Sequence, residues 1–363
     1  MRKEKTADTA AEILKKKDAE AAPLWAPERG ETEAAGQPPL VSICCITYNH
    51  ADYLPEALQG FQMQKIDFPV EILIHDDAST DGTQDLIRAF SAAHPGLVFP
   101  ILRKENQYSK GITNVSRFNF ERVRGKYVAM CEGDDYWCDP EKLQRQVEYL
   151  ECHPDCMMTM HSAQVQSLGP SKAEQLMRPF RGDRALTPQQ LVDSPAAGFP
   201  MASLVFRASL IRQLPEYYIN CPVGDIPLEL MAAAKGSAYY FDRPMSVYRV
   251  GVSGSWTDRM KAGDYAKKQQ RYAAGMQATY RAFDRATGGR FHGEAQRAAE
   301  KIHFLTLVNT KQYEQVLRPE NRSLYRELSM RTRFFIRLEH GCPGLYRLLR
   351  RLAGRAAAPE RRK

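Results

Sequence analysis

The chain contains 363 residues, of which 43% are hydrophobic and 26% are charged, and its formal net charge is +8. These values are typical of a globular protein with a large core. No stretch approaches 18 consecutive apolar residues and the N-terminus lacks a basic-then-apolar signal segment, so we expect neither a membrane-spanning helix nor export. Residues 331–363 carry ten Lys and Arg against two Glu, which makes them a basic tail on a neutral body.

Eight cysteines in a chain of this length do not indicate a disulfide framework. Cys152, His153, Cys156 and His161 could suggest a zinc site, but their spacing does not fit the usual zinc-ligand patterns well. We therefore expect reduced thiols and a cytoplasmic protein.

The first half of the chain alternates apolar runs with segments of helical periodicity. Residues 1–37 show no sustained apolar period and are interpreted as a flexible leader. Strands are expected at 40–46, 70–75, 97–102 and 127–131, and helices after Asp52, after Thr83, at 114–123 and after Asp139-Pro140. Asp52 and Asp139 are the expected N-caps of their helices. The alternation predicts an α/β fold with a doubly wound, mostly parallel sheet.

The pattern changes after residue 156. Further strands are expected at 156–165, 201–207, 238–241 and 245–250, with a short helix opening at Thr187-Pro188, a helix at 228–234 and a loop at 251–256. From about residue 258 onward the periodicity is helical. We therefore divide the chain into the leader 1–37, a sheet domain at 38–256 and a helical C-terminal region at 257–363.

Polar side chains lie at the carboxyl ends of three expected strands. They are Thr47, Tyr48 and Asn49 after the first, Asp76 and Asp77 at the second, and Glu132, Asp134 and Asp135 at the fourth. Ligands of such sheets bind beyond these strand ends, so we expect the three groups to share one rim. Confined carboxylates raise each other's pKa, and a hard divalent cation would offset their repulsion. The alternative for the acidic group is a solvated turn or helix cap.

Several ordered motifs resemble those of the family 2 glycosyltransferases, which have the GT-A fold. The motifs are 41–43 with Tyr48-Asn49, HDDASTDGT at 75–83, KENQYSKG at 104–111, EGDDYW at 132–137 and PMSVYR at 244–249. The resemblance covers about residues 39–256 and is closest to the transferases of bacterial surface-polysaccharide synthesis. It implies an inverting, metal-dependent transfer of a sugar from a nucleotide-sugar donor, with UDP expected, to a saccharide or lipid-linked acceptor.

The resemblance also implies roles for individual residues. Asp135 would bind Mn²⁺ or Mg²⁺, Asp134 would bind the metal or the ribose, and Asp225 would be the catalytic base. Glu229 is the nearest rival base, and Asp225 could alternatively be a simple helix cap. The other residues placed at the substrates are Thr47, Tyr48, Asn49, Asp76, Asp77, Lys110, Arg249 and Trp256.

For three of these residues the sequence allows a second role. Tyr48 would flank the base of the nucleotide, or pack on the rim of the sheet. Asp77 would accept a hydrogen bond from the base, whereas Asp76 could instead hold its turn through Ser79 or Thr80. Trp256 would close over donor or acceptor as a lid, or pack on the surface.

The sequence departs from the family after Tyr248-Arg249, where many relatives carry a histidine and this chain has Val250-Gly251-Val252. Two alternatives follow: this chain lacks a metal or phosphate contact that is common in the family, or Arg249 or a loop residue supplies it. Two rival functions stay open: a non-catalytic sugar-nucleotide or membrane-binding module on the same fold, and a Rossmann oxidoreductase. The oxidoreductase is disfavoured because no glycine-rich turn follows the first strand.

The tail 331–363 interleaves large apolar residues with arginines. Such a basic amphipathic segment suits an anionic membrane surface, at the inner face of the cell membrane for a cytoplasmic protein. The alternative is a solvated helix that docks its apolar face on the catalytic domain. Nucleic acid is not an expected partner, because no recognised nucleic-acid module accompanies the charge.

Overall fold

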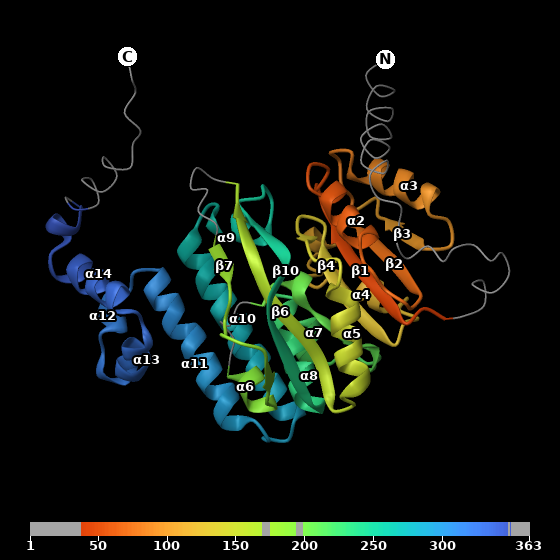
Figure 1. The fold of residues 1–363 in the computed structure, drawn as a ribbon. Helices are drawn as coiled ribbons and strands as arrows, with labels where there is room; N and C mark the ends of the chain where they lie inside the picture. The colour runs from red at the N-terminus through yellow and green to blue at the C-terminus, as the bar shows by residue number, and fades with distance from the viewer. Residues whose placement is uncertain (1–37, 169–174, 194–198, 348, 350–363) are drawn as a thin grey trace, which may run out of the picture.

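The computed structural model describes residues 38–168, 175–193, 199–347 and 349, so the expected leader 1–37 lies outside the described residues. Within these ranges ten strands form one sheet in the order β3-β2-β1-β4-β9-β6-β10-β5, with β7 paired to β6 and β8 to β10 (Figure 1). The strands are β1 Val41–Thr47, β2 Val70–Asp76, β3 Val98–Leu102, β4 Tyr127–Glu132, β5 Tyr136–Trp137, β6 Cys156–Ser167, β7 Gln175–Met177, β8 Arg184–Leu186, β9 Val205–Arg207 and β10 Ser237–Val250.

The first four strands confirm the expected alternation of strands and helices. β1 pairs in parallel with β2 on one side and with β4 on the other. Successive side chains of β1 enter different apolar clusters, Cys44 one and Cys45 the other. The strand is apolar throughout because both faces of the sheet are covered.

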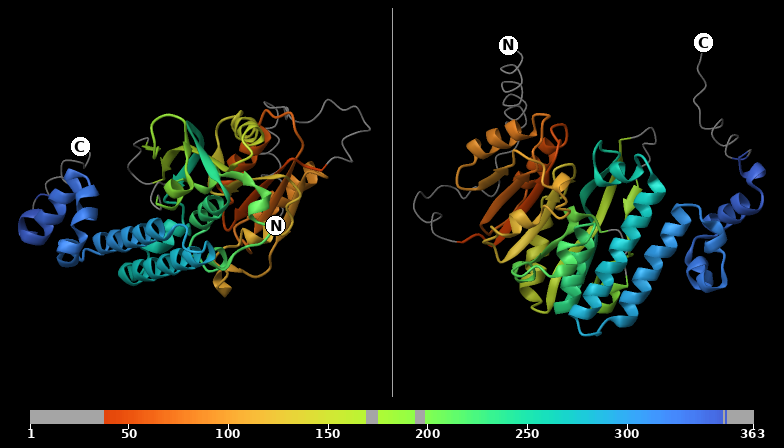
Figure 2. Two further views of the ribbon diagram at one scale, coloured as in Figure 1. Left: turned by 90° about the horizontal axis from the view of Figure 1, so that it is seen from below. Right: turned by 180° about the vertical axis from the view of Figure 1, so that it is seen from behind.

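Helices cover the two faces of the sheet. On the face of Cys45 lie α2 Leu54–Gln62, α3 Thr83–Ala93 and α5 Lys142–Cys152. On the face of Cys44 lie α4 Arg117–Phe120, α6 Pro188–Val192, α7 Glu216–Ile219, α8 Asp225–Lys235, α10 Tyr265–Ala286 and α11 His292–Asn309. The long helices α10 and α11 pack side by side behind the sheet (Figure 2).

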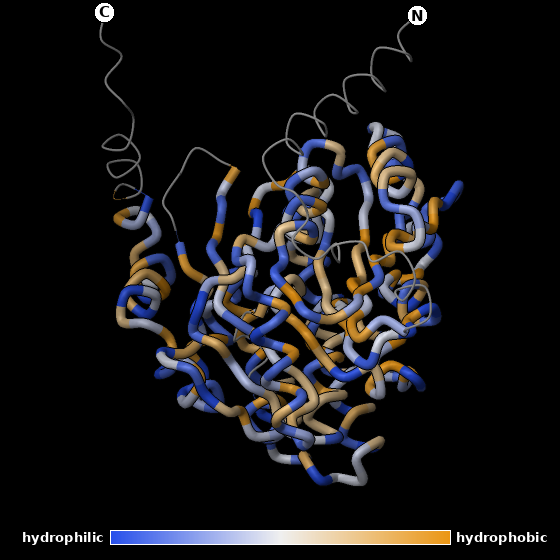
Figure 3. The backbone as a smooth tube through the Cα atoms, turned by 45° about the vertical axis from the view of Figure 1, so that its right-hand side comes forward, coloured by the Kyte–Doolittle hydropathy of each residue, from blue (hydrophilic) through white to orange (hydrophobic). Residues whose placement is uncertain are grey.

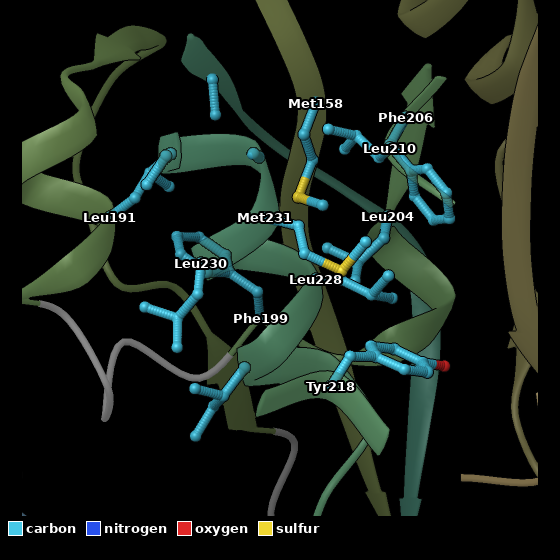
Figure 4. Packing of buried hydrophobic residues seen from close by; sticks show 14 of the residues in the cluster. Met158, Leu191, Phe199, Leu204, Phe206, Leu210, Tyr218, Leu228, Leu230 and Met231 are labelled. Atoms are coloured by element: carbon cyan, nitrogen blue, oxygen red, sulfur yellow. The ribbon is translucent and has the colours of Figure 1, made fainter. Parts of the chain in front are cut away.

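Helix α8 is the centre of the second cluster. Figure 4 shows Leu228, Leu230 and Met231 of α8 packed among Met158 of β6 and Leu204, which precedes β9. The helix is apolar nearly all round because sheet, α6 and α10 surround it. Its first residue, Asp225, is therefore fixed by a rigid element.

The C-terminal end of the chain forms a small lobe, defined here as α12 Tyr313–Val316, α13 Arg322–Glu327, α14 Met330–Gly341 and residues 343–347 and 349. The lobe lies beyond α11, away from β1, β2 and β3 (Figures 1 and 2). It has its own apolar cluster with the end of α11, made of Phe304, Leu307, Val316, Tyr325 and Ile336. No helix of the described residues has the length and apolar character needed to cross a membrane.

The apolar clusters of the sheet and of the lobe favour a division of the chain later than the expected domain boundary at residue 257. Residues of α10 and of α11 as far as Ile302 belong to the same cluster as the sheet, whereas Phe304 and later residues belong to the lobe. We propose that the sheet domain extends to about residue 302 and that the lobe is the second unit.

Some elements differ from the expectations. The strands expected at 238–241 and 245–250 are one strand, β10, whose pairing with β6 is interrupted between Phe241 and Ser246. The helix expected at 114–123 is only Arg117–Phe120. The side-chain amide of Asn114 donates a hydrogen bond to the carbonyl oxygen of Tyr218 (2.6 Å), and this bond holds the segment before the helix in a loop.

The helix starts and one strand start also differ. Asp52 and Asp139 are not N-caps: α2 is preceded by Tyr53 and α5 by Glu141, whose N–H donates to Asp139 Oδ1 over 2.9 Å. The strand expected from residue 201 begins with a single 3₁₀ turn, and β9 follows only at Val205. The short helices not yet named are α9 Trp256–Lys261 and the 3₁₀ turns Tyr108–Lys110, Met201–Ser203, Ala208–Leu210 and Pro319–Asn321.

Candidate active site

A cavity of about 380 Å³ lies where the carboxyl ends of β1, β2 and β4 face the first turn of α8 and helix α9. Residues with polar or aromatic side chains that line it include Thr47, Tyr48, His50, Asp77, Asn106, Tyr108, Glu132, Asp134, Asp225, Glu229, Tyr248, Trp256, Arg259 and Tyr272. The structure thus brings six of the residues selected from the sequence, and the rival base Glu229, to one cavity. Those six are Thr47, Tyr48, Asp77, Asp134, Asp225 and Trp256.

The loop after β1 is held by Asp76, which is fully buried and does not line the cavity. Its carboxylate accepts hydrogen bonds from Thr47 Oγ1 (2.9 Å), Ser79 N (3.0 Å) and Gln84 Nε2 (2.7 Å). Asn49 also shapes this loop: its φ is +56° and its Oδ1 accepts from Thr80 N over 2.9 Å. Asp76 and Asn49 therefore position Thr47 and Tyr48, and their expected contact with substrate stays a prediction.

Asp77 lines the cavity and also organises the opposite loop. Its Oδ1 accepts from Gln107 N (2.7 Å) and its Oδ2 from Tyr108 N (3.0 Å), while Asn106 Nδ2 donates to its carbonyl oxygen (2.9 Å). These bonds bring Asn106 and Tyr108 to the cavity wall. Lys110 is placed elsewhere: it pairs with Glu105 at an exposed position and does not line the cavity.

We call residues 132–135, at the end of β4 and before β5, the acidic loop. Its carboxylate side chains lie in two different environments. Glu132 and Asp134 line the cavity, whereas Asp135 is 1% exposed and does not. Asp135 Oδ1 accepts from the backbone N–H of Arg249 over 2.8 Å, and its Oδ2 is buried without a hydrogen-bond partner in the described residues. Asp135 therefore ties the acidic loop to β10 through one carboxylate oxygen and leaves the other unpartnered, and its expected role as metal ligand stays a prediction.

The side chain of Arg249 binds the acidic loop and does not line the cavity. Its Nη1 donates to the carbonyl oxygen of Asp134 (2.8 Å), its Nε to Gln166 Oε1 (3.2 Å), and it forms an ion pair with Glu56. The guanidinium carbon lies 4.5 Å from the centre of the Tyr136 ring. With its donors engaged in this way, Arg249 is placed to hold the acidic loop in position.

The carboxyl groups of the cavity repel each other electrostatically. Burial, together with Asp134 and Asp225, raises the pKa of Glu132 to about 8, and Arg259 opposes this shift. Burial raises the pKa of Asp225, while burial and the charge of Asp225 raise that of Glu229 well above its usual range. Such a group of carboxylates is stabilised by any cation that enters the cavity.

Several lining residues were not selected from the sequence, among them Arg259, His50 and Tyr272. Among the described residues of the cavity wall, Arg259 is the one with a permanent positive charge; its guanidinium carbon lies 4.3 Å from the Tyr108 ring centre and its Nε is buried without a hydrogen-bond partner. His50 Nε2 lies 3.8 Å from Asp134 Oδ2. Tyr272 packs edge-on against Trp256, with ring centres 5.5 Å apart.

A sequence signal for Arg259 exists in retrospect. Trp256 and Arg259 are one helical turn apart, so a helix beginning at Trp256 places both on the same face. The sequence predicted a loop at 251–256 and helical periodicity from about residue 258, so the start of α9 at Trp256, and with it the face shared by Trp256 and Arg259, was missed.

Two carboxylates of the cavity wall are of the kind that binds a divalent cation. Within the described part of the chain, no group of three or more His, Cys, Asp or Glu side chains is arranged to hold a metal ion. Glu132 and Asp134 nevertheless offer carboxylate oxygens at the cavity wall. Mg²⁺ and similar ions are commonly held by one or two carboxylates together with substrate phosphates.

Comparison with known proteins identifies the family. Residues 42–210 match the family described as Glycosyl transferase family 2. This segment of the chain belongs to glycosyltransferase family 2. The matched segment runs from β1 to the end of the 3₁₀ turn after β9, and it contains the acidic loop and the loops after β1 and β2.

Two further proteins are similar to this chain. An uncharacterized protein of Mycobacterium tuberculosis is 36% identical over 229 residues, which are 61% of this chain and 63% of that protein. The chain thus covers less than two thirds of that relative. The Escherichia coli protein WfaP, named as a UDP-Glc:alpha-D-GlcNAc-diphosphoundecaprenol beta-1,3-glucosyltransferase, is 30% identical over 112 residues, or 31% of this chain and 41% of WfaP.

A solved structure confirms the GT-A fold. The mannosyltransferase PcManGT of Pyrobaculum calidifontis, in complex with GDP-Man and Mn²⁺, superposes with a TM-score of 0.53 at 16% identity and covers 95% of this chain and 91% of that one. At this level of identity the likeness concerns the fold.

Proposed function

We propose that this protein is an inverting, metal-dependent glycosyltransferase that moves a sugar from a nucleotide-sugar donor, a UDP-sugar by preference, to a saccharide or lipid-linked acceptor. One observation carries the proposal. A single cavity gathers the aromatic Tyr48 beside Asp77, the carboxylates of Glu132 and Asp134, and the carboxylate of Asp225. These are the parts needed to hold a nucleotide, a diphosphate with its cation, and a reacting hydroxyl group.

The nucleotide end of the donor is assigned to the loops after β1 and β2. Tyr48 can lie against the face of a base, and the carboxylate of Asp77 has lone pairs left to accept from a base N–H after its two backbone bonds. Arg259, with its unpartnered Nε, is suited to the diphosphate. It takes the place of the histidine that many relatives carry after the Tyr-Arg pair.

Glu132 and Asp134 would hold Mn²⁺ or Mg²⁺ in this proposal, in place of the Asp135 assigned from the sequence. The ion would neutralise the charge that grows on the leaving nucleoside diphosphate, as a Lewis acid. Their position at the cavity wall supports this assignment, as does the raised pKa of Glu132, since a cation would remove the repulsion that causes it.

Asp225 is proposed as the base that accepts the proton of the acceptor hydroxyl group. It lies at the cavity wall on the first turn of α8, and burial raises its pKa toward the working range of a general base. Glu229, one turn further on, has the more strongly raised pKa and is assigned to hold a proton beside it. In this arrangement Asp225 carries the negative charge and Glu229 does not.

The acceptor and the place of reaction belong to the proposal as well. The name of WfaP describes an acceptor on a diphosphoundecaprenol carrier, and another relative, TuaG of Bacillus subtilis, is named for teichuronic acid biosynthesis. By analogy we assign this protein to polysaccharide or glycoconjugate synthesis at the inner face of the cell membrane. A non-catalytic module on the same fold is the second candidate.

The proposal is tested by transfer and donor hydrolysis with a panel of nucleotide sugars, with and without Mn²⁺. Asp225→Asn is expected to bind the donor like the wild type and to lose about 10²–10⁴-fold in turnover, the usual contribution of a general base. The matched variant Glu229→Gln, which mimics a protonated neighbour, is expected to keep turnover. Full turnover by Asp225→Asn would refute its role, and donor binding without turnover by the wild type would favour the non-catalytic module.

A further inference from the structure

The lobe exposes an unusual number of large apolar side chains. Of the nine such side chains that are exposed in the described residues, five lie between 330 and 349: Met330 (80% exposed), Phe334 (58%), Phe335 (36%), Leu345 (50%) and Leu349 (40%). Single exposed apolar residues are ordinary on a protein surface, but a concentration within twenty residues indicates an interaction site. We call these five residues the apolar face of the lobe.

The lobe cannot bury this face itself, because its core is small. On α14 only Ile336 is buried, at 3% exposure, against Tyr325 and the end of α11. Phe334 and Phe335 contact each other edge-on, with ring centres 5.5 Å apart. Figure 3 shows apolar and polar segments interleaved along the lobe.

Exposed basic side chains lie in the same segment of the lobe as the apolar face. Arg331, Arg337 and Arg347 are exposed, and none of them forms an ion pair with a carboxylate among the described residues. The guanidinium carbon of Arg331 lies 5.9 Å from the ring centre of Phe335. The nearest carboxylate of α14, Glu339, is engaged by Lys311 and by Tyr313 Oη (2.8 Å). The free charge of this surface is therefore positive.

We propose that the apolar face of the lobe inserts into the interface of an anionic membrane, with Arg331, Arg337 and Arg347 at the level of the lipid head groups. Aromatic and aliphatic side chains interleaved with arginines match the acyl boundary and the anionic head groups of such a surface. A second copy of this chain matches less well, because two faces of this kind would bring two basic tails of +8 each together.

This inference does not depend on the proposed transferase activity. The face lies on the lobe beyond α11, and none of its residues lines the cavity. A protein without transferase activity could still bind the membrane through this face, and an active transferase could lack membrane binding. The test therefore measures membrane binding alone.

The test is co-sedimentation of the full chain with vesicles of phosphatidylcholine, alone or mixed with phosphatidylglycerol. The wild type is expected to bind the mixed vesicles, and to lose that binding as salt is raised. Phe334→Ser with Leu345→Ser is expected to weaken binding about tenfold or more. The matched control Leu176→Ser, at a side chain 55% exposed on β7, is expected to bind like the wild type.

Charge is tested separately with Arg331→Gln and Arg337→Gln together, which are expected to weaken binding roughly 25-fold, about fivefold for each charge near the surface. Equal binding to both kinds of vesicle, or no effect of either pair of substitutions, would overturn the proposal. Sedimentation velocity without lipid completes the test. A dimer that the Phe334→Ser and Leu345→Ser variant cannot form, with no vesicle binding by the wild type, would assign the face to a second copy.

Discussion

Two adjacent aspartates of the acidic loop have opposite surroundings. Asp134 faces the cavity, whereas Asp135 is buried against the backbone N–H of Arg249. The two residues lie in the turn between β4 and β5, where the N–H of Asp135 donates to the carbonyl oxygen of Glu132 (3.1 Å), and the turn sends their side chains in different directions. The chemistry of the two side chains is the same, and only their direction assigns their roles.

The first prediction compares these two residues. Asp134→Asn is expected to weaken donor binding in the presence of Mn²⁺ by about tenfold or more, as loss of a metal ligand or its immediate support does. Asp135→Asn keeps the acceptor for the Arg249 N–H and removes a buried charge, so Mn²⁺-dependent donor affinity is expected to stay nearly unchanged. Calorimetric titration of the nucleotide sugar measures both. Loss of affinity in Asp135→Asn alone would restore Asp135 as the ligand.

The pKa of Glu229 leads to a second prediction at this scale. Glu229 is 5% exposed, and burial and Asp225 raise the pKa of its carboxyl group in the folded protein. As pH rises above the ordinary pKa of a glutamate side chain, Glu229 loses its proton in the unfolded chain but keeps it in the folded protein. The free energy of unfolding therefore falls with pH until Glu229 also ionises in the folded protein. A tenfold difference in proton affinity between the folded and unfolded chains corresponds to about 1.4 kcal/mol.

Glu229→Gln removes this titration and is therefore expected to be more stable than the wild type at neutral pH. The two proteins are expected to converge at acidic pH, where Glu229 is protonated in both states. Thermal unfolding at a series of pH values measures the difference, with Glu121→Gln at an exposed position as control. An equal difference at every pH would mean that Glu229 does not titrate on folding.

At the scale of elements, a close contact sets the position of the acidic loop. Gly60 of α2 packs on β5, the strand that follows the acidic loop, and a Cβ at Gly60 would lie 2.8 Å from the carbonyl oxygen of Trp137. Because the contact is with backbone, a side chain there would force helix and strand apart. The Trp137 ring also contacts Phe61, with ring centres 4.9 Å apart.

Gly60→Ala is therefore expected to lower the free energy of unfolding by about 1–3 kcal/mol, as overpacking usually does. Gly293→Ala is the matched control, because Gly293 is also in a helix. A Cβ at Gly293 would lie 3.5 Å from the nearest atom, at the end of the flexible Arg297 side chain. Alanine is expected to stabilise that position slightly, through its higher helix propensity. Urea unfolding distinguishes the two, and equal stabilities would contradict the close packing.

The same scale shows what the sequence could predict and what it could not. Buried parallel strands such as β1 and β2 were predictable, because a continuous apolar run has few other uses in a globular domain. Short elements such as α9 were not, because a six-residue helix leaves little periodicity to detect. Arg259 could not be assigned to the cavity for the same reason, since its position depends on how α9 packs.

The site was predictable to the level of segments. That the loops after β1, β2 and β4 meet at one rim follows from the topology of a parallel sheet. Which side chain within each loop faces the cavity depends on local hydrogen bonds, such as those that fix Asp76 to Thr47 and Ser79. The local bond of Asp76 to Ser79 was among the alternatives that the sequence raised, whereas the bond to Thr47 joins residues 29 positions apart and is not encoded in the spacing of residues.

At the scale of the whole molecule, the sheet domain and the lobe have separate apolar cores. The cluster of Phe304, Leu307, Val316, Tyr325 and Ile336 shares no residue with the two clusters that flank the sheet. Two cores joined by one helix, α11, are able to open independently. We therefore expect the lobe to be the less stable unit, because its cluster is the smaller.

Ile336→Ala tests this independence. Removing a buried isoleucine side chain usually costs about 2–5 kcal/mol, and here the loss is expected to be confined to the lobe. Hydrogen exchange is expected to show lower protection in α13 and α14 and unchanged protection in β1 and β4. Phe283→Ala, in the cluster of the sheet, is the control and is expected to lower protection in the sheet domain. A uniform loss of protection in Ile336→Ala would show that the two cores unfold together.

Strand β10 connects two walls of the cavity within a few residues. Its backbone N–H at Arg249 holds Asp135, and the chain then reaches Trp256 and Arg259 on α9 across the cavity. Any ligand that draws Arg259 inward pulls on a segment anchored beside the carboxylates of the acidic loop. The two groups that we assign to a bound diphosphate, Arg259 and the acidic loop, would thus be coupled in position through a short segment of the chain.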